Sequence, residues 1–433
     1  MGVLLFWYPS WYPAVPPIGE IDRYQFVWLL GIVPLIMLAR YSIHRRFWTA
    51  TLYDVWFFLF IVLCVLNVDY APYPSRGLFM VARPLLGMVL VLYLVEVTRV
   101  TRSLLPALSI AVGVGLVIGL MAVGTTQWTE KSADFLFIIN RLPDLVPLFS
   151  FRDFIRGGFN PNEIGGAMAW LIPLFFGLIA YPNKRLALPA LVAFSLLLLG
   201  LMLGQSRAAI IGVLFALLVV SVTVIPRGRW RMVSASGVML LALLQAAVLF
   251  NLFPAIGEPV DLAEAGLSSR DERTTNQRFD IWESALDMVT DHPLTGVGMS
   301  QFRYSLVRND YPIPNFDYPA NPAVTNFQTR LVPHAHNEFV QIATDLGVPG
   351  LLVFTMWNLI ALVMLVKVGL GGDRLTRLLA VSIAAGLAAH GIYGMGDAIP
   401  LWDRFSFLYW LMLGLAAALY LNSRHSADVS SPL

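Results

Sequence analysis

The sequence is poor in charge. Only 13% of its 433 residues are charged and 58% are hydrophobic, and the mean hydropathy is +0.70. Soluble globular proteins carry about 25% charged and roughly 45–50% apolar residues, so this composition excludes that class. The length would allow two or three soluble domains, but the hydrophobic runs are too long and too many for them. The sequence therefore predicts an all-α polytopic membrane protein with a single integrated membrane domain.

Cysteine is nearly absent. Cys64 is the only one, and it lies inside a hydrophobic run, which excludes a disulfide framework and a cysteine metal site. The net charge is +2 and the basic residues fall in short clusters between hydrophobic runs, so we expect no nucleic-acid partner. The stretch Met1–Gly19 has no basic region ahead of its apolar residues, so no cleavable signal peptide is expected. We find no internal repeat.

Hydrophobic runs of spanning length recur along the chain. A bilayer core needs about 20 mostly apolar residues per helix, and on that measure the sequence predicts about 11 spans. They lie at roughly 23–40, 51–68, 79–97, 103–124, 163–181, 186–203, 207–225, 232–253, 348–367, 377–396 and 400–421. The aromatic stretch Phe6–Tyr12 suits the membrane interface or belongs to a twelfth span, so 11 and 12 spans stay open.

Lysine and arginine mark the cytoplasmic loops of membrane proteins. Alternate connections carry them here: 40–46, 99–102, 184–185, 227–231, 374–377 and 424. This pattern places the segments 69–78, 125–162 and 254–337, and the short turn Gly204–Arg207, on the outer side of the membrane. The C-terminus is then inside, and with 11 spans Met1 is outside.

One long polar loop separates two groups of spans. We divide the chain into N-terminal spans at 1–253, the outer loop at 254–337 and C-terminal spans at 338–433. Within the loop, Thr274–Thr290 reads as a helix with Thr274 or Thr275 as its cap, ended by Pro293. A second short helix is expected from His336 to Leu346, broken by Gly347–Gly350 before the next span.

Charged side chains at membrane depth are costly and often functional. The informative ones gather on the expected outer face, and they are Arg156, Glu163, Arg207, Arg278, His336 and Asp397. Guanidinium groups suit phosphate oxygens, and a histidine with a near-neutral pKa can take a proton from a hydroxyl. Together these groups suit glycosyl transfer from a lipid pyrophosphate, with the phosphate as leaving group.

Each of these residues also has a structural interpretation. Arg278 can pair with a nearby carboxylate, an arginine at a span end commonly anchors in the headgroup region, and Asp397 can cap a helix end. His334 and His336 form a His-x-His pair that can be satisfied polar groups or adventitious metal ligands. Because no paired carboxylates or cysteines accompany them at ligand spacing, we expect no metal site.

Four motifs surround the long loop in order. They are Gly157–Glu163 (GGFNPNE); Gly204–Arg207 (GQSR); Arg278-x3-Trp282-x2-Ala285 followed by His292–Gly298 (HPLTGVG); and Pro333–Phe339 (PHAHNEF) ending in Asp345–Gly350 (DLGVPG). Each is degenerate alone. Their order and placement over about residues 150–350 resemble the O-antigen ligase and O-antigen polymerase superfamily of bacterial surface-polysaccharide enzymes.

The resemblance implies transfer of a glycan from undecaprenyl pyrophosphate to an acceptor on the periplasmic face of the bacterial inner membrane, with inversion and without metal, nucleotide or other cofactor. The essential histidine of the family is followed by asparagine and matches His336, and its arginines match Arg207 and Arg278. An acidic residue in the later spans matches Asp397. Supporting roles fall to the remaining candidates Arg156, Glu163, Trp282 and His334.

The leading interpretation is an O-antigen ligase, whose acceptor is a sugar hydroxyl of lipid A–core. A polymerase of the same superfamily would extend a lipid-linked repeat, and a protein O-oligosaccharyltransferase would use a serine or threonine. A lipid or glycan transporter is the alternative from another class. It would place charges near the membrane midplane on repeat-related broken helices, whereas here they gather at the outer face.

Overall fold

The structure is a computed structural model that describes residues 33–430, with gaps at 36, 44, 127–158, 225–227, 250–268 and 315–331. The described residues are helical, and their only β-type pairing is one isolated bridge between Thr126 and Phe159. Seven helices in this part of the chain are long and apolar enough to cross a membrane. The protein is therefore an all-α polytopic membrane protein, as the composition predicts. The total of 11 or 12 spans stays a prediction, because most of 23–40 and all of Phe6–Tyr12 lie outside the described residues.

The chain forms two compact units, each built from separated stretches of sequence. Unit 1 contains Met1–Arg102, Thr275–Met364 and Gly394–Leu421, and unit 2 contains Ser103–Thr274, Leu365–Tyr393 and Asn422–Leu433. The expected division at residues 253 and 337 concerns order along the chain, and it stays a prediction.

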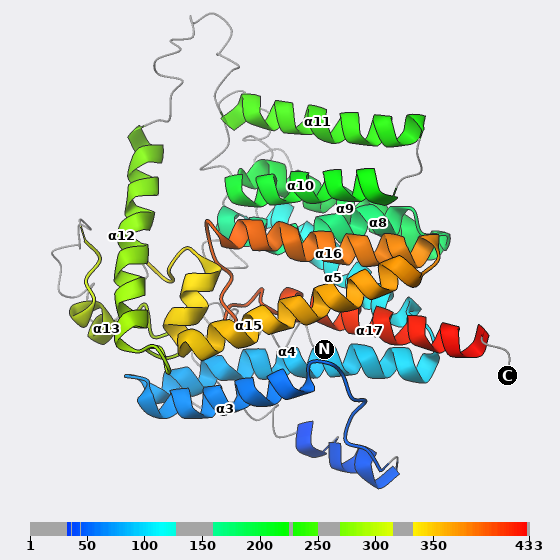
Figure 1. Cartoon of the computed structure of the whole chain (residues 1–433). Coiled ribbons are helices and arrows are strands. Elements are labelled where there is room, and N and C mark those ends of the chain that lie inside the picture. The colour runs from blue at the N-terminus through cyan, green and yellow to red at the C-terminus, as the bar shows by residue number, and fades with distance from the viewer. Residues whose placement is uncertain are drawn as a thin grey trace, which may run out of the picture. The chain divides into compact units, whose positions relative to one another are not determined.

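Most expected spans correspond to helices (Figure 1). The helices are α3 (Asp54–Tyr70), α4 (Pro74–Thr101), α5 (Leu105–Gly124), α8 (Pro161–Ile179), α9 (Lys184–Gly204), α10 (Arg207–Val224), α11 (Arg229–Leu249), α15 (Glu338–Gly371), α16 (Arg374–Gly394) and α17 (Phe407–Ser430). In the long loop the described helices are α12 (Ser269–Asp291) and α13 (Ser305–Asp310).

Three helix ends differ from or refine the expectation. Helix α12 begins at Ser269, so Thr274 and Thr275 lie inside it and neither caps it. Helix α17 begins at Phe407 rather than near residue 400, because the preceding residues form turns in which the carboxylate of Asp403 accepts from the Phe405 backbone N–H at 2.8 Å. The break expected at Gly347 is confirmed as a kink within α15, where Gly347 has φ 69°.

Bulky aromatic rings fill the core of unit 1. The ring centroids of Trp357 and Trp410 lie 5.0 Å apart, and that of Phe57 lies 5.8 Å from Trp357. A Cβ atom on Gly87 would come within 2.1 Å of the Trp410 ring, so a residue without a side chain is required where α4 meets α17. Helices α3 and α4 lie side by side in this unit (Figure 1).

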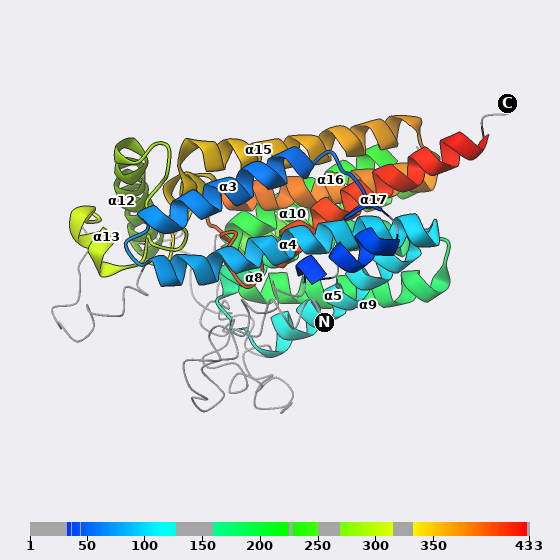
Figure 2. The ribbon, with the colours of Figure 1, turned by 90° about the horizontal axis from the view of Figure 1, so that it is seen from below.

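Small residues allow the helices of unit 2 to approach closely. Helices α5 and α9 run side by side (Figure 2), and a Cβ atom on Gly200 of α9 would lie 2.6 Å from the Cβ of Ala122 in α5. Without a hydrophobic driving force between helices in lipid, such close packing is a main source of association. Large apolar side chains such as Leu120, Leu199 and Phe215 point outward, as expected for lipid-facing surfaces.

Candidate active site

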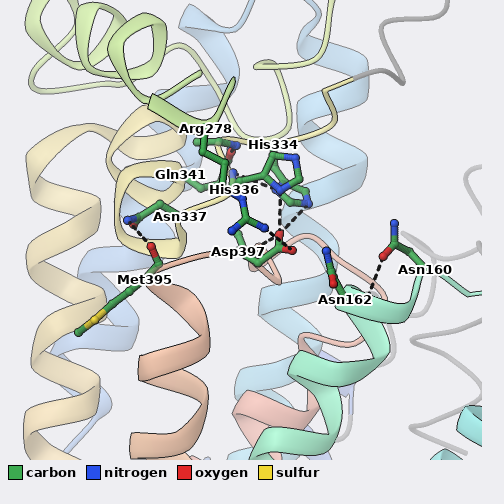
Figure 3. A network of polar contacts seen from close by, with 11 residues as sticks. Asn160, Asn162, Arg278, His334, His336, Asn337, Gln341, Met395 and Asp397 are labelled. Atoms are coloured by element: carbon green, nitrogen blue, oxygen red, sulfur yellow. Dashed lines mark hydrogen bonds and ion pairs between the residues drawn. The ribbon is translucent and has the colours of Figure 1, made fainter. Parts of the chain in front are cut away.

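Two of the three stretches of unit 1, Thr275–Met364 and Gly394–Leu421, bring His334, His336, Arg278 and Asp397 together (Figure 3). The two histidines lie on the segment that leads into α15, Arg278 lies on α12, and Asp397 lies on the turn between α16 and α17. Four of the residues singled out in the sequence therefore lie in one cluster. The role of each in a reaction is a separate matter.

His336 and Asp397 form a hydrogen-bonded pair. The Nδ1 atom of His336 lies 3.0 Å from Oδ1 of Asp397. A carboxylate accepts hydrogen bonds only, so the proton is on Nδ1 and the basic lone pair of the imidazole is on Nε2. The Asp397 side chain is 5% exposed and that of His336 is 26% exposed. The acid is thus enclosed, and the imidazole that it orients remains accessible.

Asp397 stays ionised although it is buried. Burial raises the pKa of this carboxyl, but the charge and hydrogen bond of His336, then the charges of His334 and Arg278, hold the pKa well below its ordinary value. The backbone N–H of Ala398 also donates to Oδ1 at 2.9 Å. A fixed carboxylate of this kind stabilises a positive charge on the neighbouring imidazole.

His334 is held in its neutral form. Burial is the largest cause that lowers its pKa to about 3; the nearby His336 and the cations Arg303 and Arg278 act in the same direction, and Asp397 opposes them. Its Nδ1 accepts a hydrogen bond from the backbone N–H of His336 at 3.2 Å, and its Nε2 lies 3.9 Å from Oδ1 of Asp397. His334 therefore supports the loop around His336 and does not compete with it for protons at neutral pH.

Arg278 places a positive charge beside the pair. One terminal nitrogen lies 3.9 Å from Oδ2 of Asp397, and the Arg278 side chain is 30% exposed. The sequence offered a pairing partner on α12 itself, but the structure places the guanidinium against Asp397. A partly exposed guanidinium next to a basic imidazole is suited to an anionic substrate.

The backbone of the histidine segment is fixed at its most strained point. His336 has φ 49°, in the left-handed region that a non-glycine residue rarely adopts. The next residue, Asn337, accepts hydrogen bonds from the backbone N–H groups of Phe339 and Val340, each at 3.1 Å, and so caps α15. Its amide also donates to the Met395 carbonyl at 3.2 Å. Asn337 therefore ties the segment of His336 to that of Asp397, which explains why asparagine suits the position after the histidine.

A buried polar chain supports the same segment from below. Gln341 accepts from the backbone N–H of Ala335 at 2.7 Å and donates to Oδ1 of Asp345 at 2.9 Å. The indole N–H of Trp402 donates to Oδ2 of Asp345 at 2.8 Å. Residues from α15 and from the turn that carries Asp397 are thus joined beneath the two histidines. Gln341 and Trp402 carry no motif signal, so sequence reasoning did not find them.

Trp282 has a packing role. It lies against a hydrophobic cluster that includes Ala285, Phe302 and Ala335, and its ring meets that of Phe279 edge to face at 5.4 Å. Ala335 separates the two histidines, so this cluster joins α12 to the histidine segment. The supporting role expected of Trp282 remains a prediction, and this contact is its physical basis.

In unit 2, two motifs meet. A Cβ atom on Gly204, in the GQSR motif, would lie 3.5 Å from the carbonyl oxygen of Pro161, in the GGFNPNE motif at the start of α8. Glu163 lies in the first turn of α8 and the exposed Arg207 is the first residue of α10. The pairing of these motifs could not be read from the sequence. Arg156 lies outside the described residues, and the functional roles of Glu163 and Arg207 stay predictions.

The cluster also has the atoms of a possible metal site. One ligand atom from each of His334, His336 and Asp397 lies within 4.8 Å of the others, and two imidazole nitrogens with one carboxylate oxygen are a set that zinc accepts. Asp397 supplies the acid that the sequence analysis did not find beside the histidine pair. The expectation that no metal is used therefore stays a prediction for experiment.

Two comparisons with known proteins agree with the motifs. Residues 192–355 match the family model described as O-antigen ligase, a range that includes Arg207, Arg278, His334 and His336. A Rickettsia felis protein described as a polysaccharide ligase is 28% identical over 114 residues, which is 26% of this chain and 26% of that protein. The match thus spans about a quarter of the length of that relative. These findings support a glycan-transferring enzyme of ligase type.

Proposed function

We propose that the protein transfers a glycan from undecaprenyl pyrophosphate to a sugar hydroxyl of lipid A–core on the periplasmic face of the inner membrane. The match of residues 192–355 to the family model described as O-antigen ligase supports this proposal. The observation that carries the proposal is the contact of His336 Nδ1 with Asp397 at 3.0 Å beside Arg278. It provides a base, the acid that orients the base and a cation for the leaving group at one place.

The residues divide the reaction between them. The Nε2 atom of His336 takes the proton of the acceptor hydroxyl, and the acceptor oxygen attacks the anomeric carbon of the donor sugar. The bond between that carbon and the phosphate oxygen breaks, and its electron pair leaves with undecaprenyl pyrophosphate. Arg278 stabilises the charge that develops on this leaving group, and we assign Arg207 the same task. One direct displacement inverts the anomeric configuration.

The same parts suit any acceptor hydroxyl. An O-antigen polymerase would present the end of a lipid-linked repeat to His336, and a protein O-oligosaccharyltransferase would present serine or threonine. The three activities give different products, so one assay separates them. Purified full-length protein is incubated with a lipid-linked glycan and each acceptor in turn, in EDTA, and the product is identified by mass spectrometry. Transfer to lipid A–core supports the ligase activity. Transfer to another acceptor instead would replace this proposal with the activity that uses that acceptor.

Replacing the base tests the mechanism. His336→Gln should lower the transfer rate by about 10²- to 10⁴-fold, because positioned proton transfer contributes about that factor, while the protein remains inserted and folded. The matched control is His292→Gln, since the His292 side chain is exposed at the end of α12 and contacts neither Asp397 nor Arg278. Near-normal transfer by folded His336→Gln would refute the assignment. Activity that EDTA abolishes and zinc restores would replace it with a metal mechanism.

A further inference from the structure

Arg303 brings a second guanidinium to the site of unit 1. It lies on the turn between the Gly296–Gly298 bends and α13, and its Cζ atom lies 4.2 Å from the centroid of the Trp402 ring. A cation held over an indole face gains about 0.5–2 kcal/mol. The contact thus fixes the position of the charge, and the side chain remains only half-buried.

The Trp402 ring joins Arg303 to the histidine segment. Its indole N–H donates to the carboxylate of Asp345, and the side-chain amide of Gln341 donates to the same carboxylate. The amide oxygen of Gln341 accepts from the backbone N–H of Ala335, the residue between the two histidines. Trp402 and Asp397 lie on the same turn between α16 and α17, so Arg303 over the indole and Arg278 beside Asp397 contact one turn. Both cations therefore act on the same small region, one from α12 and one from the loop that follows it.

A neighbouring arginine shows what a structural guanidinium looks like in this fold. Arg308 is buried, with Nε donating to the Phe302 carbonyl at 2.8 Å and Nη1 to the Ser284 hydroxyl at 3.1 Å. Its remaining nitrogen lies 3.6 Å from the sulfur of Met288. Arg308 thus holds the loop against α12 and lies over the Phe302 ring at 3.9 Å, whereas Arg303 is only partly buried and lies over Trp402, on the turn that carries Asp397.

A diphosphate carries more charge than one arginine beside a carboxylate can balance. Part of the charge of Arg278 is offset by Asp397 at 3.9 Å. We propose that Arg303 binds the diphosphate group of the lipid-linked donor together with Arg278, as a binding residue that none of the four motifs contains. This assignment rests on the proposed function and names the part of the substrate that Arg303 would contact.

Inorganic pyrophosphate is the probe. It should inhibit transfer by the wild-type protein in competition with the lipid-linked donor. Arg303→Ala should raise both its inhibition constant and the donor KM by about 10- to 100-fold, the range expected for loss of a charged hydrogen-bond donor, and leave the acceptor KM unchanged. Arg303→Lys should fall between, because lysine keeps the charge but not the planar fork. Arg404→Ala is the matched control, because it also removes one arginine and its positive charge. The Cζ atom of Arg404 lies 5.6 Å from the centroid of the Phe405 ring, in the turn that contains Trp402.

The outcomes separate the two proposals. If the wild-type protein transfers glycan and folded Arg303→Ala keeps the wild-type inhibition constant and donor KM, the role of Arg303 is refuted and the proposed function stands. An equal rise of the inhibition constant and donor KM in Arg404→Ala also refutes the role of Arg303, since the effect would then come from the loss of any nearby positive charge. If Arg303→Ala does not fold, Arg303→Lys decides, and an unchanged inhibition constant overturns the proposal. A wild-type protein that transfers no glycan to any acceptor refutes the proposed function itself.

Discussion

His336 and His334 differ in chemistry although they are two residues apart. The imidazole of His336 donates from Nδ1 to the carboxylate of Asp397 at 3.0 Å. The imidazole of His334 accepts from a backbone N–H and lies under the influence of two arginines, which disfavour its protonation. A pair of identical side chains is thus divided by its surroundings into a base and a neutral support.

The low pKa of His334 predicts a pH-dependent stability. In the fold its pKa is about 3, whereas an unfolded histidine titrates near about 6.5. Between these values His334 binds a proton in the unfolded chain but not in the fold, so the contribution of His334 to stability falls as the pH falls from about 6.5 toward 3. The slope for one proton is at most about 1.4 kcal/mol per pH unit. Above that window His334 is neutral in both states and contributes no slope.

The measurement is the thermal midpoint in detergent across this window, for the wild type and for His334→Gln. The variant should show a shallower decline, because the proton taken up by His334 on unfolding is gone. The ionised Asp397 does not confuse the result, since a carboxyl with a depressed pKa loses its contribution only below its ordinary value of about 3.9. Parallel pH profiles for the two proteins would contradict the assignment of His334 as a buried neutral group.

At the scale of elements, the start of α15 decides the geometry of the site. Asn337 caps the helix through its carbonyl oxygen and holds the Met395 carbonyl through its amide N–H. Ten residues later Gly347 turns the chain with φ 69°, where a Cβ atom would lie 2.6 Å from the Pro293 carbonyl oxygen. The first turns of α15 are therefore fixed at both ends before the long apolar part of the helix begins.

Two substitutions of Asn337 separate capping from bridging. Asn337→Ala removes both and should lower the free energy of unfolding by about 1 kcal/mol, the usual value of an N-cap. Asn337→Asp keeps a good cap but has no N–H for the Met395 carbonyl, so it should retain stability and lose transfer activity. Thermal unfolding and the transfer assay measure the two effects. Full activity in Asn337→Asp would show that the bridge to Met395 does not position the site.

The sequence was sufficient for some of these elements and not for others. Apolar runs of spanning length predict α4, α5 and α8–α10, since lipid leaves few alternatives to a helix. His336, Arg278 and Asp397 could be selected because charge at the membrane surface is conspicuous. Gln341, Trp402 and Arg303 could not, because their importance arises from contacts among the turn after α12, the start of α15 and the turn before α17. The spacing of residues along a chain contains no such information.

At the scale of the whole molecule, the distribution of lysine and arginine predicts which side of the membrane the site faces. Helix α16 is long and apolar enough to cross the bilayer, so its two ends should lie on opposite sides. Met395 follows α16 and is 61% exposed. Gly371, the last residue of α15, precedes α16, and a side chain added there would meet no other atom within 4 Å. The native Cys64 is buried and should give little background in a labelling experiment.

Cysteine substitution tests that orientation. In spheroplasts, Met395→Cys should react with a membrane-impermeant maleimide, because this turn carries Asp397 and is expected in the periplasm. Gly371→Cys should react only after the membrane is permeabilised. The converse pattern would place His336 and Asp397 on the cytoplasmic side and exclude a periplasmic reaction.

The division of unit 1 among three distant stretches also sets the time at which the site comes into being. A ribosome releases the part with His336 long before the turn with Asp397, and the whole of unit 2 up to Tyr393 is synthesised between or before them. A nascent chain therefore cannot orient its imidazole until nearly all of its spans have been inserted.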